Sequence, residues 1–561
     1  MADCGTLRDF FDDAVRECPG RVAVEFVRDG RTCRRTFGEM SARVRAIAEL
    51  LASVGIEPRA KPVALMLENG PDWVETYLAL AGTAVPVVPL DPKLKPAEIT
   101  YVMRNASCLA PITDHAHVEV AERVAPDLPS LRTVLLHLAP DDAAPDTIAG
   151  RECVAIETRL AALKHPAAAA TSRYSSVAPT PDDVAAIIYT SGSTGAPKGA
   201  MITHANFTSD AIGTLATVKV LKSSDRFLVV LPLFHAFSFT TNMLLTLRLH
   251  ARMQFVQSLR TLGEDFRRFH PTIMMTVPLL LEKIAAKFDD ALRTNRWLLL
   301  FQAFHLRGLV KNVMRLQLGG CLRLVVSGGA PCPPGTISFM RRFGVSVVEG
   351  YGLTEASPVV SVSEPKVARI GTIGLALENI EARIDNPDDQ GIGELVIRGP
   401  IVMKGYLGMP EATAEALEGG WLHTGDLASV DSDGFYTIRG RKKSLIVNRE
   451  GKNNYPEEVE LCLARDPLLR DVLILGYHDR EDVGEKVGLI VVPDEAAFKA
   501  ADGSQLPRPE IETRVRAIVQ TQCGDLAAYK HPRKIDIRFE PLRRTPSLKI
   551  ERKFYEGQLD R

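Results

Sequence analysis

The chain has 561 residues, of which 46% are hydrophobic and 24% charged, so it can bury several cores and form two or more domains. Its 68 Lys and Arg residues nearly balance its 69 Asp and Glu residues, which excludes a general attraction for nucleic acid or for an anionic membrane. The nine cysteines are scattered and never form a Cys-x-x-Cys pair, which argues against a disulfide framework and a structural zinc site and favours a cytoplasmic location.

The first residues, MADCGTLRDFFDDAV, are acidic where a signal peptide would be basic and then apolar. No apolar run approaches the ~20 residues of a membrane span. We therefore expect a soluble protein, and peripheral contact with a membrane stays open because an amphipathic patch needs no long apolar run.

Residues 35–114 alternate between amphipathic stretches and short apolar runs. The stretches Glu39–Leu51 and Trp73–Ala81 alternate with the runs Pro62–Leu67 and Val85–Leu90, and PAEITYVMRNA and CLAPIT follow. This alternation predicts repeated strands and helices, and hence a parallel sheet with helical crossovers. Residues 137–183 are rich in Ala, Pro, Asp and Ser and are predicted to form an exposed connector.

Four later apolar runs each end abruptly in a polar or glycine-rich segment. They are VAAIIY before TSGSTG, FLVVLP before LFHAF, LRLVVS before GGAP, and VSVVE before GYGLTE. Ligands of open parallel sheets bind at the carboxyl ends of the strands, so these segments are predicted to converge on one crevice.

The sequence pattern changes after about Gly371. Short β-branched runs with Asp-Gly and Gly-Gly turns extend to Gly440 and predict an antiparallel barrel or hairpin layer, and residues 441–561 have their own helix and strand pattern. We predict an α/β fold with a large domain over residues 1–440, built of doubly wound, mostly parallel sheets plus the barrel layer. A small α+β domain is predicted over residues 441–561.

The segment Tyr189–Gly199, YTSGSTGAPKG, has the composition of a phosphate-binding loop. Between a strand and a helix, its backbone N–H groups and hydroxyls can point at phosphate oxygens, and Lys198 adds a positive charge. Pro197 and Gly199 flank Lys198, whereas a Walker loop needs Gly before and Ser or Thr after its lysine, so a P-loop NTPase is disfavoured.

With this loop, the chain resembles the adenylate-forming superfamily, which includes acyl-CoA synthetases, firefly luciferase and the adenylation domains of peptide synthetases. The resemblance covers nearly the whole chain. Its segments occur in family order: YTSGSTGAPKG, LPLFHAF, SGGAP, GYGLTEAS, WLHTGDLA, GRKKSLIVNREGKNNYPEEVE and PSLKIERK.

The resemblance implies a site for ATP and Mg²⁺. It implies Thr354, Glu355 and Lys549 as catalytic residues, with Glu355 as the metal ligand and Lys549 reaching the α-phosphate. Gly328 to Ala330 would bind adenine, Tyr351 would stack on it, and Asp426 with Arg441 would bind the ribose. The implied ATP-binding residues are Thr190, Ser191, Gly192, Ser193, Thr194, Gly195, Lys198, Gly328, Gly329, Ala330, Tyr351, Gly352, Asp426 and Arg441.

The resemblance also implies that the small domain is mobile. Lys443 falls at the family's hinge, and a rotation there would first present Lys549 for adenylation and then a second face, with Gly451 and Lys452, to coenzyme A. Many relatives have Gly before the terminal lysine, whereas this chain has Leu548, as long-chain acyl-CoA synthetases do.

The acyl side is implied by LPLFHAF, which places Phe234, His235 and Phe237 along the carboxylate pocket. Peptide-synthetase domains usually carry an Asp where His235 stands, so amino-acid substrates are disfavoured, because a buried ammonium group would lack a partner. Met274, Met275 and the stretch Trp297–Leu318 suit an adaptable apolar channel or plain core. We expect a medium- or long-chain fatty acid, with aromatic acids as the nearest alternative.

The expected enzyme is an AMP-forming acyl-CoA synthetase that uses ATP, Mg²⁺ and coenzyme A and binds no nucleic acid. One alternative is transfer of the acyl group to the pantetheine of a carrier protein. Ligases of that kind carry an insertion that restrains the small domain, and the path from Asp426 to Lys443 contains none. A non-catalytic nucleotide-binding relative and a luciferase-type oxidase are more distant alternatives, and the sequence does not give the oligomeric state.

Overall fold

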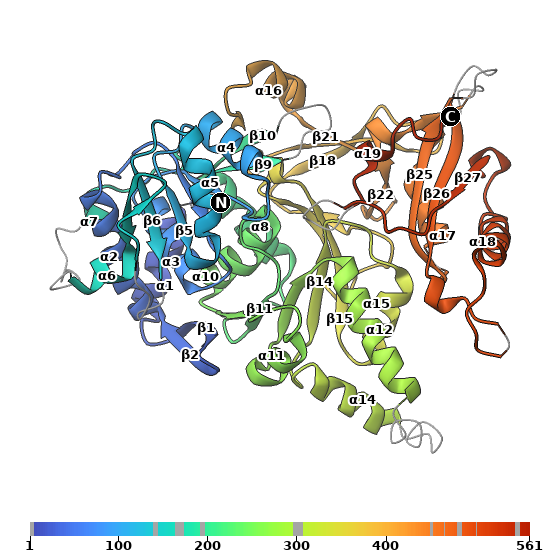
Figure 1. Cartoon of the computed structure of the whole chain (residues 1–561), viewed down its shortest axis with the longest axis horizontal. Helices are drawn as coiled ribbons and strands as arrows, with labels where there is room; N and C mark the ends of the chain where they lie inside the picture. The colour runs from blue at the N-terminus through green and yellow to red at the C-terminus, as the bar shows by residue number, and fades with distance from the viewer. Residues whose placement is uncertain are drawn as a thin grey trace. The chain divides into compact units, whose positions relative to one another are not determined.

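The computed structural model describes residues 5–138, 144–162, 173–190, 197–294, 307–448, 453–464, 466–478, 485–500, 502–544 and 550–560 (Figure 1). Its contacts divide the chain into two compact units. The first comprises Met1–Glu381 and Ile397–Leu422, and the second comprises Ala382–Val396 and His423–Arg561. This division groups the hairpin layer with the C-terminal residues, and it does not test the predicted domain boundary between residues 440 and 441, which stays a prediction.

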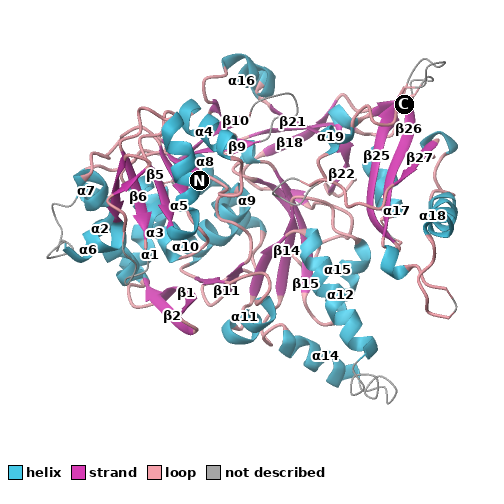
Figure 2. Ribbon diagram, in the orientation of Figure 1, coloured by secondary structure: helices cyan, strands magenta, loops and turns pink. Residues whose placement is uncertain are grey.

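The first unit contains two nine-stranded sheets, whose strands are magenta in Figure 2. The first sheet has the order β20-β10-β9-β4-β3-β5-β6-β8-β7, and its pairs from β9 through β4, β3, β5 and β6 to β8 are parallel. Its strands are β3 (Val63–Met66), β4 (Val87–Pro89), β5 (Pro111–Asp114), β6 (Thr133–His137), β7 (Thr147–Ile148), β8 (Arg151–Ala155), β9 (Val184–Thr190), β10 (Lys198–Thr203) and β20 (Gly405–Tyr406).

The second sheet has the order β17-β16-β15-β14-β13-β11-β12-β1-β2, with parallel pairing from β15 to β1 and antiparallel strands at both edges. The prediction of mostly parallel sheets is therefore confirmed. Its strands are β1 (Val22–Arg28), β2 (Arg31–Thr36), β11 (Arg226–Val229), β12 (Arg252–Phe255), β13 (Ile273–Thr276), β14 (Leu324–Gly328), β15 (Ser346–Gly352), β16 (Val359–Val362) and β17 (Leu375–Ala376).

Helices cover both sheets of the first unit. Thr6 and Thr36 cap the starts of α1 and α2 with their side chains, and Pro71 opens α3, as helix-start preferences predict. The helices are α1 (Leu7–Glu17), α2 (Phe37–Ser53), α3 (Pro71–Gly82), α4 (Pro96–Asn105), α5 (Val118–Val124), α6 (Ile156–Ala162), α7 (Arg173–Ser176), α8 (His204–Thr217), α9 (Ala236–Ser238), α10 (Leu245–Leu249), α11 (Leu262–Phe269), α12 (Pro278–Thr294), α14 (Arg307–Gln317), α15 (Pro334–Arg342) and α16 (Pro410–Ala416).

Strand alternation sends the buried side chains of the two sheets to different cores. Val63 and Leu65 of β3 join a core that also contains α1, α2, α3, α8 and the inner face of the second sheet. Ala64 and Met66 point to the opposite face, against α4 and α5. On the far face of the second sheet, Val325 packs with α11, α12 and α15. One layer of helices is therefore enclosed between the two sheets.

The prediction of an exposed connector over residues 137–183 was wrong in part. β8 pairs in parallel with β6 and antiparallel with β7, so this segment contributes two strands to the first sheet, and the helix α6 follows them. The reason is the short run Val154 to Ile156, whose side chains are buried. Residues 139–143 and 163–172 lie outside the described residues.

The described residues of the second unit form a four-stranded, a two-stranded and a three-stranded sheet. In the four-stranded sheet β18-β19-β21-β22, β21 pairs antiparallel with β22, as the hairpin texture predicts. The three-stranded sheet β25-β26-β27 packs against α17 and α18. The elements are β18 (Glu381–Asp385), β19 (Gly393–Arg398), β21 (Leu422–Val430), β22 (Tyr436–Arg441), β23 (Ile446–Val447), β24 (Asn453–Asn454), β25 (Leu469–Tyr477), β26 (Lys486–Pro493), β27 (Lys534–Ile537), α17 (Pro456–Leu463), α18 (Arg508–Gln522) and α19 (Arg552–Tyr555).

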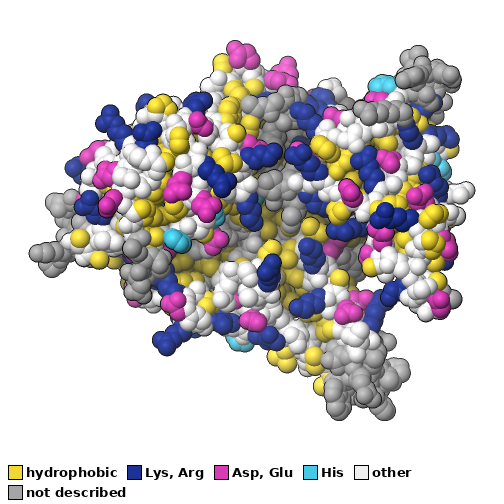
Figure 3. All heavy atoms as spheres, in the orientation of Figure 1, with side chains coloured by type: hydrophobic (Ala, Val, Ile, Leu, Met, Phe, Trp, Pro, Cys, Tyr) yellow, Lys and Arg dark blue, Asp and Glu magenta, His cyan; other side chains and the backbone are white. Residues whose placement is uncertain are grey.

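The surface carries both signs of charge. Figure 3 shows Lys and Arg side chains interspersed with Asp and Glu side chains over the visible face, in keeping with the net charge of −1. Among the helices that the structure describes, none is both long enough and apolar enough to cross a membrane.

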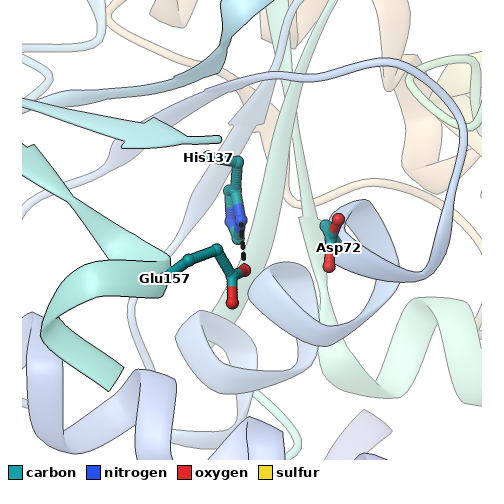
Figure 4. A group of neighbouring side chains, drawn as sticks. All are labelled: Asp72, His137 and Glu157. Atoms are coloured by element: carbon teal, nitrogen blue, oxygen red, sulfur yellow. Dashed lines mark ion pairs between the residues drawn. The ribbon is translucent and has the colours of Figure 1, made fainter. Parts of the chain in front are cut away.

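A network of charged side chains lies where α2, α3 and α6 meet β6. Asp72, His137 and Glu157 have donor atoms within 4.8 Å of one another, and Figure 4 shows His137 beside Glu157. Arg43 already compensates these carboxylates: its Nη2 lies 2.8 Å from Glu157 and 3.3 Å from Asp72, and its Nε lies 2.8 Å from the fully buried Glu75. A metal ion here would have to displace Arg43, so we interpret the group as a structural ion network.

The network also fixes the ionisation of Glu157. Burial alone would raise its pKa, but hydrogen bonds from His137 and Arg43 and the charge of Arg43 lower the pKa of Glu157 to about 2. The pairing therefore stabilises the fold above the ordinary pKa of 4.5, and this contribution is lost only as the pH falls towards 2.

We predict that Arg43→Ala destabilises the chain strongly, because the buried Glu75 then keeps only Arg35, of the described residues, as a charged partner and Glu157 loses its guanidinium partner. Breaking a buried pair in this way costs about 3–5 kcal/mol. The matched control is Arg16→Ala, which removes an exposed pair with Asp13 and should cost less than about 1 kcal/mol. Urea unfolding followed by tryptophan fluorescence compares the two variants, and equal shifts of the midpoint would contradict the role of Arg43.

Candidate functional site

An apolar cavity of about 80 Å³ lies at the carboxyl ends of β14 and β15. Thr214 of α8, Thr241 of the π-helical segment Phe239–Leu244 and Met275 of β13 contribute to its wall, together with glycines of the two strand ends. All of the described side chains that line it are neutral. The segments after β11, β14 and β15 therefore meet at one cavity, as predicted, whereas residues 191–196 after β9 lie outside the described residues.

Several predicted site residues share the wall of this cavity. Gly328, Gly329, Tyr351 and Gly352, predicted to bind ATP, line it together with Phe237, predicted for the acyl pocket. A Cβ atom at position 328 would lie 2.9 Å from Cζ of Phe237, so glycine is needed there for the aromatic ring to close the wall. Ala330, the third residue of the predicted adenine loop, is exposed next to Gly329.

At Gly352 the backbone lies very close to the backbone of Pro358. A Cβ atom there would lie 1.7 Å from the carbonyl oxygen of Pro358, which any side chain would clash with. This close approach turns the chain from β15 into the short turn Thr354–Ala356, which holds two of the predicted catalytic residues. Glycine at 352 therefore fixes where Glu355 emerges.

The other predicted acyl-pocket residues lie apart from the cavity wall. The rings of Phe234 and His235 lie next to each other, with centroids 4.5 Å apart, and neither side chain lines the cavity. Met275 lines it, but Met274 points to the opposite face of β13 and packs in the core with α12. Side chains alternate along a strand, so of the two methionines predicted to suit a channel or plain core, one lines the cavity and the other lies in the core.

Glu355 is held by residues from a distant segment. Its backbone carbonyl accepts a hydrogen bond from the N–H of Met403 at 2.8 Å, and its Oε1 accepts one from the hydroxyl of Tyr406 at 2.9 Å. Burial and the charge of Glu355 raise the pKa of Tyr406, so the hydroxyl remains a donor. A half-buried carboxylate oxygen is the kind of ligand that Mg²⁺ prefers, so Glu355 fits its predicted role.

Lys198 lies on the same tyrosine, and its Nζ is 5.0 Å from the centroid of the Tyr406 ring. The prediction that a helix follows this loop was wrong, because residues 198–203 form the strand β10. The apolar run Ala200 to Ile202 explains this strand, which pairs antiparallel with β9. Thr190 and Lys198, the described ends of the predicted phosphate loop, are directly opposite each other.

In the second unit, Asp426 and Arg441 lie opposite each other on β21 and β22, and Arg441 Nε is 2.7 Å from Asp426 Oδ1. The structure therefore brings the two predicted ribose residues together. Lys443, the predicted hinge, is exposed in the turn Lys442–Ser444 that follows β22. Ser191, Gly192, Ser193, Thr194, Gly195, Gly451, Lys452 and Lys549 lie outside the described residues.

The sequence did not single out Glu394, which supports the predicted ribose residues. Its buried carboxylate accepts hydrogen bonds from Lys442 Nζ at 2.8 Å and from the Gly425 N–H at 3.0 Å, and His423 Nδ1 lies 3.2 Å away. Burial raises the pKa of Glu394, but these hydrogen bonds outweigh it and hold the pKa below its usual range. In the sequence Glu394 stands between Gly393 and the apolar run Leu395 to Ile397, and this pattern gave no functional signal.

Two further residues were missed for the same reason. Tyr406 stands between the glycines of a short GYLG segment, and Glu349 lies at the end of an apolar run. The Glu349 carboxylate accepts hydrogen bonds from the N–H groups of Cys332 and Gly371, each at 3.1 Å, and so ties the residues that follow the predicted adenine loop to β15.

The chain matches the sequence model of a family described as AMP-binding enzyme over residues 11–407. It is 29% identical to the long-chain-fatty-acid–CoA ligase FadD15 of Mycobacterium bovis, over 96% of this chain and 93% of the relative. It is also 32% identical to a feruloyl-CoA synthase of Amycolatopsis sp, over 91% of each chain.

Solved structures with a similar fold include the anthranilate CoA ligase AuaEII in complex with anthranoyl-AMP. The TM-score is 0.79 at 21% identity, over 99% of this chain and 97% of that one. The O-succinylbenzoate coenzyme A synthetase (MenE) of Bacillus subtilis, in complex with ATP and magnesium ion, gives a TM-score of 0.74 at 22% identity, over 97% and 98%. These similarities show the fold.

We predict that Glu394→Ala destabilises the chain by about 1–3 kcal/mol, because Lys442, His423 and the Gly425 N–H lose a buried acceptor. The matched control is Glu381→Ala, which removes an exposed pair with Arg398 and should have little effect. Because the Glu394 pKa is lowered, its stabilisation is fully present above the ordinary pKa of 4.5 and is lost as the pH falls through the lowered pKa. Thermal unfolding at pH 7 and pH 4 should therefore show a smaller deficit at pH 4, and a larger one would contradict this account.

Proposed function

The chain belongs to the AMP-binding enzymes and is an acyl-CoA synthetase of the AMP-forming type, and we propose that its acid is a medium- or long-chain fatty acid. The observation that carries the proposal is the neutral, apolar cavity beside Gly352, three residues before Glu355. It offers an acyl group a place next to residues suited to a magnesium triphosphate.

In the proposed first step, a carboxylate oxygen of the acid attacks the α-phosphorus of ATP. The bond from that phosphorus to the pyrophosphate oxygen breaks, which gives acyl-AMP and pyrophosphate. Lys198 and Lys549 supply positive charge for the phosphates, where charge develops during the reaction. Mg²⁺ supplies further positive charge when it is bound, and Glu355 is the residue that would hold it.

The remaining nucleotide contacts are proposed residue by residue. Thr190 and the loop residues Ser191 to Gly195 bind phosphate, and Gly328 to Ala330 with Tyr351 bind adenine. Asp426 accepts hydrogen bonds from the ribose hydroxyls, and Arg441 Nε, 2.7 Å from its Oδ1, orients the carboxylate. Their types fit these ligands, since backbone N–H groups bind phosphate and a carboxylate binds paired hydroxyls.

In the proposed second step, the thiol of coenzyme A loses its proton and the sulfur attacks the acyl carbon. The bond from that carbon to the AMP oxygen breaks, which gives the thioester and AMP. Rotation at Lys443 takes the enzyme from the first step to the second, because it withdraws Lys549 and presents Gly451 and Lys452 to coenzyme A. The position of Lys443 in an exposed turn supports this, because a turn absorbs backbone rotation while packed elements move as units.

The neutral wall of the cavity supports an uncharged acyl group. An amino acid would place its ammonium group there without a carboxylate partner, which is costly. The relatives include a fatty-acid ligase and a feruloyl-CoA synthase, so an aromatic acid is the second candidate. The direct hairpin from β21 to β22 supports coenzyme A as acceptor over a carrier protein. A cytoplasmic location and peripheral membrane contact remain predictions.

Pyrophosphate release measured over a panel of fatty, aromatic and amino acids, with and without coenzyme A, tests the function. We expect release with fatty acids of medium or long chain, and a thioester only when coenzyme A is present. Release with 4-hydroxycinnamate and not with decanoate or palmitate would overturn the fatty-acid proposal in favour of the aromatic acid. Release with no acid would overturn the function itself.

We also predict that Lys549→Ala lowers adenylation at least ~100-fold, as loss of a group that stabilises transition-state charge does. The same variant should convert supplied acyl-AMP and coenzyme A to thioester at nearly the wild-type rate. The control is Lys553→Ala, four positions along the chain, which should leave both rates unchanged. Equal loss of both half-reactions in the Lys549 variant would refute its assignment.

A further inference from the structure

Tyr406 stands between two residues of opposite charge, both proposed to act on the triphosphate. Its hydroxyl donates to Glu355 Oε1 at 2.9 Å, and its ring lies 5.0 Å from Lys198 Nζ. The carboxylate of Glu355 therefore lies at the hydroxyl end of the tyrosine, and the ammonium group of Lys198 lies over the ring face.

The position of Tyr406 is fixed from both sides. It lies on β20, where it pairs with Ala200 of β10, two residues beyond Lys198. Its N–H donates to the Thr413 hydroxyl at 2.9 Å, and that hydroxyl in turn donates to the carbonyl of Met409 at the start of α16. The backbone pairing and the Thr413 hydroxyl therefore place the tyrosine independently of the two charged side chains that contact it.

Neither Lys198 nor Glu355 forms an ion pair with any residue that the structure describes. A lysine and a glutamate at one ring would ordinarily approach each other, and each would then neutralise the charge that the triphosphate needs. The tyrosine hydroxyl occupies Oε1 of Glu355 and leaves Oε2 without a hydrogen bond from the described residues. The ring face holds the ammonium group by a cation–π contact, which leaves its three N–H donors for phosphate.

We propose that Tyr406 is a positioning residue that orients the Glu355 carboxylate toward the magnesium ion of MgATP and keeps it apart from Lys198. This inference rests on the proposed function, because it assumes that Glu355 is the metal ligand. Partners that orient a ligating carboxylate typically change metal affinity 10–100-fold when they are removed.

The test measures metal binding and needs no acid and no turnover. Mn²⁺ replaces Mg²⁺, and electron paramagnetic resonance measures the affinity of the full chain with ATP for Mn²⁺. Tyr406→Phe removes the hydroxyl and keeps the ring, and it should weaken Mn²⁺ binding by about 10-fold or more while the thermal midpoint stays near that of the wild type. Wild-type affinity in this variant would overturn the orienting role.

The matched control is Tyr436→Phe. The Tyr436 hydroxyl also donates a hydrogen bond of 2.9 Å, but to the backbone carbonyl of Ala382 in the second unit. This variant should bind Mn²⁺ like the wild type. If both variants weaken Mn²⁺ binding equally, the effect is a general loss of a tyrosine hydrogen bond and the proposal fails.

A second substitution tests the separation of charges. Tyr406→Leu, or Tyr406→Met should the leucine variant not fold, removes the ring as well as the hydroxyl and allows Lys198 to pair with Glu355. Its affinity for ATP, measured by calorimetry without metal, should fall at least ~3-fold below that of Tyr406→Phe, the size of a modest cation–π contact. Equal ATP affinity in the two variants would refute the separating role.

Failure of this inference can be told apart from failure of the proposed function. If the wild-type chain binds no Mn²⁺ with ATP and releases no pyrophosphate with any acid, the proposed function fails. If the wild type does both and Tyr406→Phe binds Mn²⁺ equally well, only the role of Tyr406 fails.

Discussion

Enclosure of one layer of helices between two parallel sheets is the constraint on which the first unit depends. Strands such as β3 and β14 are buried on both faces, so their backbone polar groups are satisfied only by neighbouring strands. Loops can therefore leave the sheets only at the strand ends. The cavity, Gly352 and Glu355 all follow from this, because β14 and β15 end side by side.

The cavity wall is neutral, and the charged side chains proposed to act on ATP lie outside it. Apolar and hydroxyl side chains form the cavity wall, so a ligand gains there mainly by leaving water, and a charged group would be penalised. Glu355 and Lys198 both contact Tyr406 and form no ion pair with a described residue, whereas in the second unit Asp426 is paired with Arg441. Opposite charges are thus held apart at Tyr406, as we propose, and are paired between β21 and β22.

Much of this could be predicted from the sequence where the signal was local. The periodicity of residues 39–51 and the proline at 71 predicted α2 and α3, and apolar runs before glycine-rich segments predicted the strand ends at the cavity. The failures were non-local. Tyr406 and Glu355 are 51 positions apart and Glu394 and Lys442 are 48 apart, so no pattern in a short window joins them. β8 was hidden for the same reason, because only its pairing with β6 makes so short a run a strand.

The shared acceptor Glu394 has a thermodynamic consequence. One carboxylate binds the Gly425 N–H, next to Asp426, and the side chain of Lys442, next to Lys443. Both hydrogen bonds are made at once to one side chain, Gly425 to Oε1 and Lys442 to Oε2, so a shift of one affects the other. Such coupling is reciprocal: if a backbone rotation beyond Lys442 changes the hydrogen bond to Gly425, a ligand on Asp426 changes the preferred rotation by an equal free energy. Binding at the proposed ribose contact and the conformation of the turn Lys442–Ser444 would then influence each other through Glu394.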